Sequence, residues 1–411
     1  MIVLFRWPLR ILCALVVLLL SYLNFSLYNE PSCIPLPNGR HLHPEVLDQL
    51  HFLKRKLRHE RAGEEAQQIY PEGYVFIHAL YALAWCDVVA ALPPESTSTQ
   101  EGMAEIVFSL NALDSPAGRQ VFKPDLPLSY GAFYRGWTTY LRGRYLQLRP
   151  AAERDSAEFR RFQIDCSVIA RAIQQTEKPY LESYRDMVWP ADNVVCLAAL
   201  ALHDRIAAPQ FQGVKNAWLN RIQRDISPEQ PLIPHSYDVE SGRPSEAARG
   251  SSQVLMLNLL WDVDSVFARS QYAVFRQQFL AYQLGLPGIR EYPQGTLGMG
   301  DVDSGPVVLG VGGTASVVGI RAAAQYGDWY LWAGLRSGVE ALLLPQRSGG
   351  EKQYLLGQLP VLDAFMAWSN ASVCPASVPA AGNWRWKFQM ISVLLAAIFA
   401  ACTLIRVPKS S

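Results

Sequence analysis

The sequence has almost no excess of either charge. Its 37 Lys and Arg residues are matched by 36 Asp and Glu residues, which leaves a formal net charge of +1 over 411 residues. Proteins that bind nucleic acid usually carry a strongly basic surface. Nucleic acid is therefore not an expected partner of this chain.

Several motifs with a known chemistry are also missing. The chain has no C-x-x-C pair and no cluster of histidines, so we expect no metal site. It has no G-x-S-x-G, P-loop or H-E-x-x-H motif, and no strand precedes the glycines at 298, 300 and 310 that would suggest a dinucleotide site. We expect no cofactor, and any chemistry would come from the side chains alone.

Long runs of alternating β-branched residues are scarce, which favours an all-α chain. Apolar segments rich in small and aromatic residues recur every 54 to 60 residues or so, beginning near Gly73, Gly131, Ala191, Ala247, Gly305 and Leu359. Amphipathic segments alternate with them, near residues 45–60, 101–113, 155–175, 214–225, 264–284 and 328–343. Twelve such helices predict an (α/α)6 barrel, with the apolar six inside and the amphipathic six outside. An open solenoid of helix pairs is the alternative.

The stretch from Arg290 to Asp328 joins a polar, glycine-rich half to an apolar, small-residue half. Asp303 or Ser304 is a natural N-cap, and Pro306 suits the first turn of a helix. We therefore expect an inner helix from about Gly305, with carboxylates on the loop before it. The alternative is that these acidic residues only cap the helix.

The two ends of the chain differ from its middle. Residues 9–28 and 388–405 are apolar runs of nearly membrane-spanning length, which predicts two transmembrane helices around a domain at 29–383. A cleavable signal peptide is the alternative for the first run, although no small-x-small cleavage site follows it. Arg6 and Arg10 place residues 1–8, and with them the tail 406–411, in the cytoplasm, although the basic run at 54–58 weakens that assignment. The domain is therefore expected on the extracytoplasmic side of the membrane.

Two of the seven cysteines flank the domain. Cys33 and Cys374 lie in proline-rich segments just inside the two apolar runs, so we predict that they lie close enough to form a disulfide. Cys86, Cys166 and Cys196 fall within apolar helical patterns and are expected to be buried thiols.

In an (α/α)6 barrel, the loops that lead into the inner helices lie at one end of the ring, so their polar residues should converge on one mouth. Carboxylates there are the equipment of general acid/base catalysis. The catalytic candidates are Asp192, Asp301, Asp303, Glu72 and Glu291. The candidates for substrate binding are Tyr237, Arg249, Trp137, Trp189, Tyr70, Tyr134 and Asn193. Capping or pairing with arginine is the alternative role for each of them, and His78 and His203 are expected to be packing residues.

The chain resembles the linalool dehydratase/isomerase family, bacterial terpene hydro-lyases with an (α/α)6 barrel. The resemblance begins at Asp192-Asn193, His203-Asp204-Arg205 and Ala217-Trp218-Leu219, and continues through Ser236-Tyr237, Glu240-Ser241-Gly242 and Phe267-Ala268-Arg269. It resumes at Arg290-Glu291, the Asp301/Asp303 stretch and Gly327-Asp328. The resemblance implies the barrel and a substrate pocket.

The family's catalytic His and Cys positions are not retained. Trp137 stands where the family has its catalytic His, and Trp189 and about Ala198 stand where it has two Cys. Phe76 replaces one catalytic Tyr. These departures put linalool itself in doubt as the substrate.

Three functions remain open at this point. The first is a membrane-anchored enzyme that eliminates or isomerises a hydroxylated, terpenoid or lipid-like small molecule by acid/base chemistry. The second is a glycan-processing hydrolase, lyase or epimerase, because (α/α)6 barrels often use paired carboxylates on sugars. The third is a non-catalytic binding protein, and the oligomeric state is left open.

Overall fold

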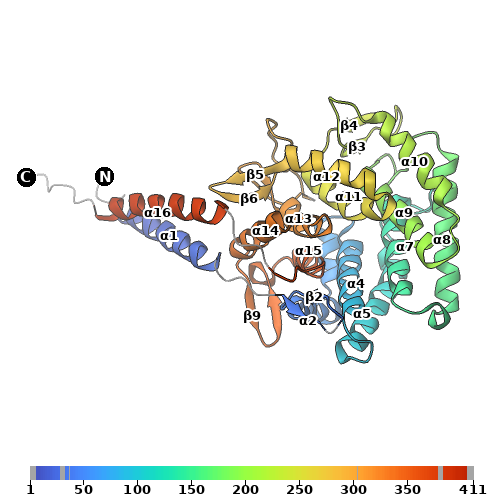
Figure 1. Ribbon diagram of the computed structural model, residues 1–411, viewed down its shortest axis with the longest axis horizontal. Helices are drawn as coiled ribbons and strands as arrows, with labels where there is room; N and C mark the ends of the chain where they lie inside the picture. The colour runs from blue at the N-terminus through green and yellow to red at the C-terminus, as the bar shows by residue number, and fades with distance from the viewer. Residues whose placement is uncertain (1–5, 28–32, 37, 303, 378–382, 405–411) are drawn as a thin grey trace, which may run out of the picture.

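The computed structural model describes residues 6–27, 33–36, 38–302, 304–377 and 383–404. Within this part of the chain, six helices form a closed inner ring, and its members are labelled in Figure 1. Each inner helix packs on the next, and the last packs on the first. The inner helices are α4 (Gly73–Ala91), α7 (Gly131–Gln147), α9 (Pro190–Ile206), α11 (Gly250–Val263), α13 (Gly313–Gln325) and α15 (Pro360–Asn370).

A second layer of six helices surrounds this ring, and each outer helix packs against one or two inner helices. These are α5 (Thr97–Asp114), α8 (Ser156–Gln175), α10 (Gln212–Asp225), α12 (Ser265–Phe279), α14 (Trp329–Leu342) and α2 (Val46–His59). The predicted (α/α)6 barrel is therefore confirmed, and the contact between α15 and α4 excludes an open solenoid. Short helices complete the loops: α3 (Ala62–Ile69), α6 (Pro116–Arg119), η1 (Ala151–Glu153) and η2 (Leu355–Gly357).

Small antiparallel hairpins lie in the loops, one before the outer helix α2 and the others before inner helices. They pair β1 (Ile34–Pro35) with β2 (His41–Leu42), β3 (Ser236–Tyr237) with β4 (Pro244–Glu246), β5 (Leu280–Gln283) with β6 (Leu286–Ile289), β7 (Val307–Val308) with β8 (Val311–Gly312), and β9 (Gln346–Ser348) with β10 (Glu351–Gln353).

The predicted start of the fifth inner helix was wrong. Residues 307–312 form the β7–β8 hairpin, and α13 begins only at Gly313. The turn of this hairpin has positive φ at both Leu309 and Gly310, as a two-residue hairpin turn of type I′ requires. Ser304 does not cap the helix but bonds within its own loop, where its hydroxyl accepts from the Asp301 N–H at 2.8 Å. Asp303 lies outside the described residues.

Two other predicted boundaries shift for the same reason. Strand β4 precedes α11, so that helix begins at Gly250 rather than at Ala247. Helix α12 ends at Phe279, because residues 280–289 continue as the β5–β6 hairpin rather than as helix to residue 284.

Helix α4 shows why the inner ring is apolar on nearly every side. Its residues face both the ring centre and the outer helices, and most of them are buried. By length and composition this helix could cross a membrane, but 83% of its apolar window is buried within the protein. It is therefore a core helix of the barrel.

Aromatic side chains fill the centre of the ring. Phe76 of α4 contacts Phe133 and Trp137 of α7, with ring centroids 4.9 and 5.4 Å apart, and it also contacts Phe365 of α15. Trp137 in turn meets the ring of Trp368 at 6.4 Å. Pairs at these separations add to the burial of apolar area, so this plug helps to hold three inner helices together.

Charged side chains join the inner helices near their C-terminal ends. Asp87 of α4 accepts bonds from Arg144 of α7 and Arg321 of α13, each at 2.7 Å. Asp262 of α11 pairs with Arg205 of α9 at 2.7 Å. Because partly buried arginines and aspartates are stable there only when paired, this network fixes the helices relative to one another.

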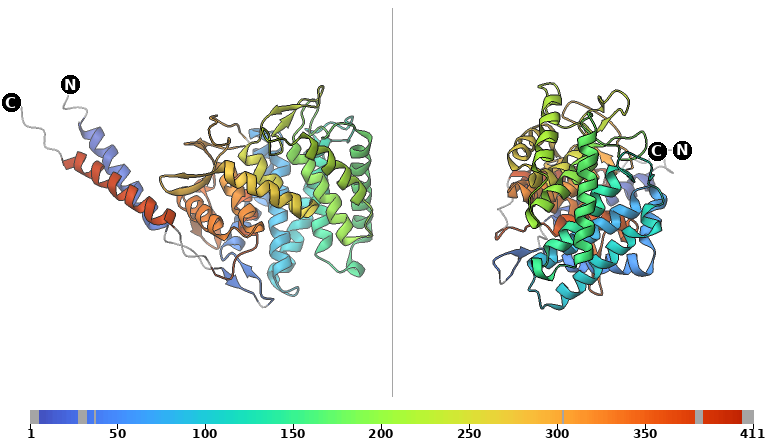
Figure 2. Two further views of the ribbon diagram at one scale, coloured as in Figure 1. Left: turned by 45° about the horizontal axis from the view of Figure 1, so that its top comes forward. Right: turned by 90° about the vertical axis from the view of Figure 1, so that its right-hand side faces the viewer.

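Helices α1 (Arg6–Ser26) and α16 (Asn383–Leu404) project together from one side of the barrel, with the start of α1 and the end of α16 farthest from it (Figures 1 and 2). The amide of Asn24 donates to the Ser392 hydroxyl at 2.8 Å and so links the two helices. Residues 7–26 are long and apolar enough to cross a membrane and only 11% buried; a signal sequence near an N-terminus has the same properties.

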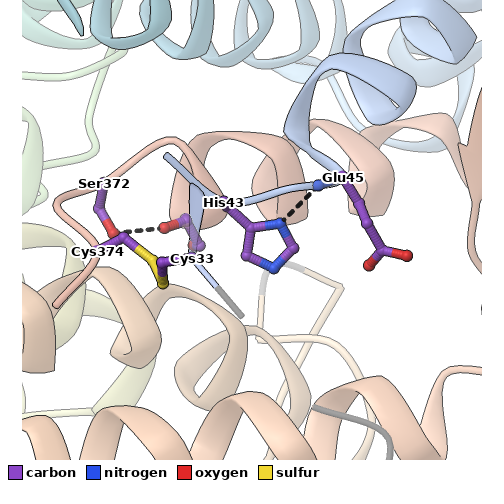
Figure 3. The surroundings of a disulfide bond; sticks show 6 residues. Cys33, His43, Glu45, Ser372 and Cys374 are labelled. Atoms are coloured by element: carbon purple, nitrogen blue, oxygen red, sulfur yellow. Dashed lines mark hydrogen bonds between the residues drawn. A yellow bond between two sulfur atoms is a disulfide. The ribbon is translucent and has the colours of Figure 1, made fainter. Parts of the chain in front are cut away.

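The base of this helix pair packs against the barrel. Leu23, Leu27, Trp384 and Phe388 form a small cluster with Ala341 of α14. Cys33 and Cys374, which pack with the core of the barrel, form a disulfide with their Cα atoms 6.2 Å apart, within the distance expected from sequence (Figure 3). The bond ties the segment after α1 to the segment before α16.

We predict that peptide mapping under non-reducing conditions recovers Cys33 linked to Cys374. After unfolding, the buried thiols of Cys86, Cys166 and Cys196 should react with alkylating reagents as free cysteines. Disulfides persist on the extracytoplasmic side of a membrane. Free thiols at 33 and 374 in protein purified without reductant would contradict both the bond and the proposed side.

We also predict that Gly250→Ala destabilises the barrel. A Cβ atom at this position would lie 1.9 Å from the carbonyl oxygen of Arg290, so the backbone must shift at a cost of about 1–3 kcal/mol. Gly213→Ala is the matched control, because a Cβ there meets nothing within 4 Å. Urea unfolding in detergent, followed by circular dichroism, should show a lower midpoint for the first variant only.

Candidate functional site

Three of the predicted site residues meet at the loops leading into α11 and α13. Arg249 occupies the N-cap position of α11 with an extended backbone, and its side chain does not cap the helix. The N–H of Gly250 donates to the carbonyl of Glu291 at 2.8 Å, which fixes the segment after β6 against the start of α11. Glu291 and Asp301 are thereby brought to the same guanidinium group.

Glu291 is the buried half of this arrangement, with no exposed side-chain area. Its carboxylate accepts from Nε of Arg249 at 2.8 Å and from the hydroxyl of Ser251 at 2.7 Å. Burial raises the pKa of Glu291 above its usual value, although the bonds from Ser251 and Arg249 oppose that shift. Glu291 thus holds Arg249 in place from the interior side.

Asp301 is the accessible half, with 46% of its side chain exposed. It accepts from Nη1 of Arg249 at 2.5 Å and from the N–H of Ser304 at 3.0 Å. Partial burial favours the neutral form, but the bonds from Arg249 and Ser304 outweigh it and lower the pKa of Asp301 to about 2. Asp301 is therefore ionised and open to solvent at neutral pH.

His235, which was not among the sequence candidates, completes the group. Its Nδ1 bonds the hydroxyl of Ser252, and its Nε2 lies 3.4 Å from Nη1 of Arg249. Burial and the charge of Arg249 lower the pKa of His235 to about 4, so the imidazole is neutral at pH 7. Nothing in the local sequence Pro234-His235-Ser236 marks this role, because it depends on contacts made only after folding.

Glu246 at the end of β4 is a second exposed carboxylate beside this group. One of its oxygens lies 3.7 Å from Nη1 of Arg249, and the other lies 3.8 Å from Nε2 of His235. The sequence places it in the loop before α11 without singling it out. We call His235, Glu246, Arg249, Glu291 and Asp301 the Arg249 cluster.

Other predicted residues serve the structure at their positions. Tyr134 donates its hydroxyl hydrogen to the carbonyl of Leu113 at 2.9 Å. The side chain of Asn193 bonds both backbone groups of Leu181 and so holds the loop before α9. Trp137 is fully buried in the aromatic plug.

The remaining candidates fall into two groups, one before α4 and one at the start of α9 and on β3. Asp192 is buried in the first turn of α9, where its backbone lies against Gly136 of α7. Glu72 precedes α4 without capping it. Tyr70 lies before α4, whereas Trp189 before α9 and Tyr237 on β3 lie near each other, because the N–H of Tyr237 donates to the carbonyl of Val188 at 3.0 Å.

Tyr237 lines a cleft of about 590 Å³ on the other side of the β3–β4 hairpin. Its ring lies against Tyr180 at 4.6 Å, and its hydroxyl donates to Asp225 at 3.4 Å. Glu182, Lys178 and polar groups of the β3–β4 turn also line this cleft. The lining of the cleft is thus mainly polar, since the two tyrosines are buried against each other.

A third group of polar residues lies near the disulfide. His43, Glu45 and Glu340 bring their ligand atoms within 4.8 Å of one another, a separation that suits a metal ion. The ammonium group of Lys352, however, already bonds Glu45 at 2.6 Å and Glu340 at 2.8 Å. The two carboxylates therefore have a cation within the chain itself.

The comparisons with known proteins identify no family for this chain. No family model matches it, and no curated protein is similar to it. Among solved structures, a selenomethionine derivative of the GH76 alpha-mannanase from Bacteroides thetaiotaomicron is similar, with a TM-score of 0.47 and 8% sequence identity. That match covers 76% of this chain and 95% of the mannanase chain.

The neutral state of His235 predicts a pH dependence of stability. Between its ordinary pKa of about 6.5 and its folded value of about 4, the unfolded chain binds a proton that the folded protein does not. Folding stability should therefore fall as the pH is lowered across this window. His235→Gln should reduce that loss, by up to about 3 kcal/mol at about 1.4 kcal/mol per pKa unit. Urea unfolding at pH 7 and pH 4.5 checks this, and equal losses in both proteins would contradict it.

Proposed function

We propose that this protein is a membrane-anchored enzyme that performs acid/base chemistry without a cofactor at the Arg249 cluster. One observation carries the proposal: an ionised, accessible carboxylate, Asp301, shares a buried arginine with a second exposed carboxylate, Glu246, next to a neutral histidine. Sites that hold titratable groups in contrasting states within one pocket are typical of acid/base catalysis.

Each residue of the cluster takes a distinct role in this proposal. Asp301 accepts a proton from the substrate, since it is charged and reachable. Glu246 faces the same arginine from the other side and accepts a hydrogen bond from the substrate's hydroxyl group, while the departing oxygen takes the proton that Asp301 received. Arg249 sets the distance between the two carboxyl groups. Glu291 is fully buried and cannot reach a substrate, and it positions Arg249 from the interior of the barrel. Neutral His235 offers a further site for a proton in transit.

A hydroxylated, lipid-like molecule is the proposed substrate. The loop that carries Asp301 exposes two large apolar side chains, Leu297 at 88% and Met299 at 93%. Such side chains are costly in water and suit contact with an apolar part of a substrate. The apolar helices α1 and α16 would hold the enzyme where such a molecule partitions. Elimination of water or isomerisation, as in the family that the sequence resembles, fits this chemistry.

Glycan processing is the second candidate, and a different observation favours it. Asp301 and Glu246 contact the same nitrogen of Arg249 at 2.5 and 3.7 Å, so their oxygens are close enough to act on opposite sides of one glycosidic bond, where retaining enzymes need about 5 Å. The nearby cleft, with Lys178, Glu182 and Asp238 among its lining residues, offers polar groups for the hydroxyls of a sugar.

Mass spectrometry of ligands retained by the purified protein, together with a screen of terpenoid alcohols, hydroxylated lipids and oligosaccharides, separates these two candidates. Conversion of an oligosaccharide but of no lipid would replace the first candidate with the second. If no compound is converted and a retained ligand is released unchanged, the protein is a binding protein.

We predict that Asp301→Asn lowers turnover of the identified substrate by about 10²–10⁴-fold, because an amide keeps the shape of the side chain and cannot accept the proton. The matched control is Asp125→Asn, which alters a surface carboxylate that also pairs with an arginine, Arg185. Circular dichroism should show both variants folded. Full activity of Asp301→Asn would remove Asp301 from the mechanism.

A further inference from the structure

Five leucines adopt a backbone conformation that leucine rarely takes. Leu284, Leu309, Leu344, Leu355 and Leu356 all have φ between 46° and 61°. The left-handed region costs an L-residue with a Cβ atom roughly 1–2 kcal/mol, and turns that need it normally use glycine or asparagine. Each of these leucines lies in a turn next to a short hairpin or 3₁₀ helix.

These turns are also exposed. The side chains of Leu284, Leu309, Leu344 and Leu356 are 47%, 65%, 46% and 60% exposed. Exposed apolar neighbours extend the surface, namely Tyr282, Val308 and Leu342. An exposed leucine in such a turn has two free-energy costs in water: the left-handed backbone conformation, and the exposure of its apolar side chain. We call this set the leucine turns.

The leucine turns lie around α14, beside the base of the α1–α16 pair. Figure 1 shows α14 between the β5–β6 hairpin and β9 on the side of the barrel that faces α1 and α16. A Cβ on Gly285, which follows Leu284, would lie 2.7 Å from the backbone nitrogen of Phe388 in α16. Backbone and side-chain bonds connect the other turns: Gln283 donates to the carbonyl of Leu309 at 2.8 Å, and Leu355 donates to that of Leu343 at 3.0 Å.

The first turns of α16 indicate where the surface of a bilayer would lie relative to the leucine turns. Trp386 is 50% exposed there, and Lys387 is its exposed neighbour. Tryptophan next to lysine at the end of an apolar helix is typical of the boundary between bilayer and water. Because the turn of Leu284 contacts this part of α16, that leucine lies at the same level as the boundary.

We propose that the leucine turns are a bilayer-contact surface that seats the edge of the barrel against the membrane holding α1 and α16. This inference rests on the anchoring proposed above. The partner is the interfacial region of the lipid bilayer, where the apolar tips enter and the peptide groups of the turns remain hydrated. The short connections to α1 and α16, joined by the disulfide, keep this edge next to the membrane. The loop of Asp301, with Leu297 and Met299, then opens close to the lipid from which a hydrophobic substrate would come.

Site-directed fluorescence on the full-length protein in lipid nanodiscs tests this contact. An environment-sensitive dye is attached at Leu284→Cys or Leu309→Cys, and at Gln174→Cys on α8 as the control, since α8 lies at the opposite end of the barrel (Figure 1). The unsubstituted protein gives the background labelling of its own cysteines, which are buried or disulfide-bonded. Lipids with a spin label near the headgroup should quench the dye at 284 and 309 severalfold more than at 174.

Equal quenching at all three positions would overturn the contact. A blue-shifted dye that spin-labelled lipid does not quench would indicate a protein partner or a second copy of this chain instead, and would also overturn it. Liposome flotation of the same samples separates the two proposals. Protein that floats but shows no quenching at 284 and 309 retains the anchor and loses the contact, whereas protein that does not float has lost the anchor itself.

Leu284→Asn and Leu309→Asn provide a second measurement. Asparagine tolerates the left-handed conformation better than leucine and is polar. The double variant should therefore fold at least as stably in detergent. A dye at Leu344→Cys should lose quenching in nanodiscs when both tips are polar. Unchanged quenching at 344 would show that the turns do not act as one surface.

Discussion

Closure of the inner ring is the constraint on which the structure depends. One face of an inner helix packs against side chains at the centre of the ring, and the opposite face packs against an outer helix. An inner helix must therefore be apolar on nearly all sides. Such a helix is stable in water only when both faces are covered. The aromatic plug around Phe76 and Trp137 fills one face, and the outer helices cover the second. Removing one contact in the circle would expose two helices at once.

Closure of the ring also brings together the polar side chains at one end of the barrel. Inner helices that run in one direction around a ring bring their preceding loops to one end, and there a buried arginine can hold carboxylates from different loops. Arg249 is 96% buried on its side chain and is balanced by Glu291 and Asp301. Since a buried cation is stable only with partners, the geometry of the loops and the ionisation of Asp301 are set together.

The spacing of apolar segments was enough to predict the barrel, because each helical hairpin needs a similar length of chain. It failed at Gly305 for a physical reason. A proline after Asp and Ser suits a helix start, but the Leu309-Gly310 turn that follows accommodates positive φ and lets the same residues form a hairpin. Arg249, Glu291 and Asp301 were found because their loops share one end of the ring. His235 was missed, and Tyr237 was misplaced relative to the cluster, because the two sides of the β3–β4 hairpin cannot be told apart from sequence.

The pairing of α2 with α15 has a consequence for how the chain is made. Helix α2 is the first element of the barrel to be synthesised, and its inner partner α15 is the last. Helix α2 therefore lacks its partner α15 until translation is almost complete. The apolar side of α4 that α15 covers stays exposed to solvent for the same time. Contacts between distant parts of a chain form slowly, and the apolar surfaces that they will bury are prone to aggregation until then. If α1 is inserted in a membrane during synthesis, α2 and α4 stay close to the site where the chain emerges. Helix α15 would then appear next to the two helices against which it packs.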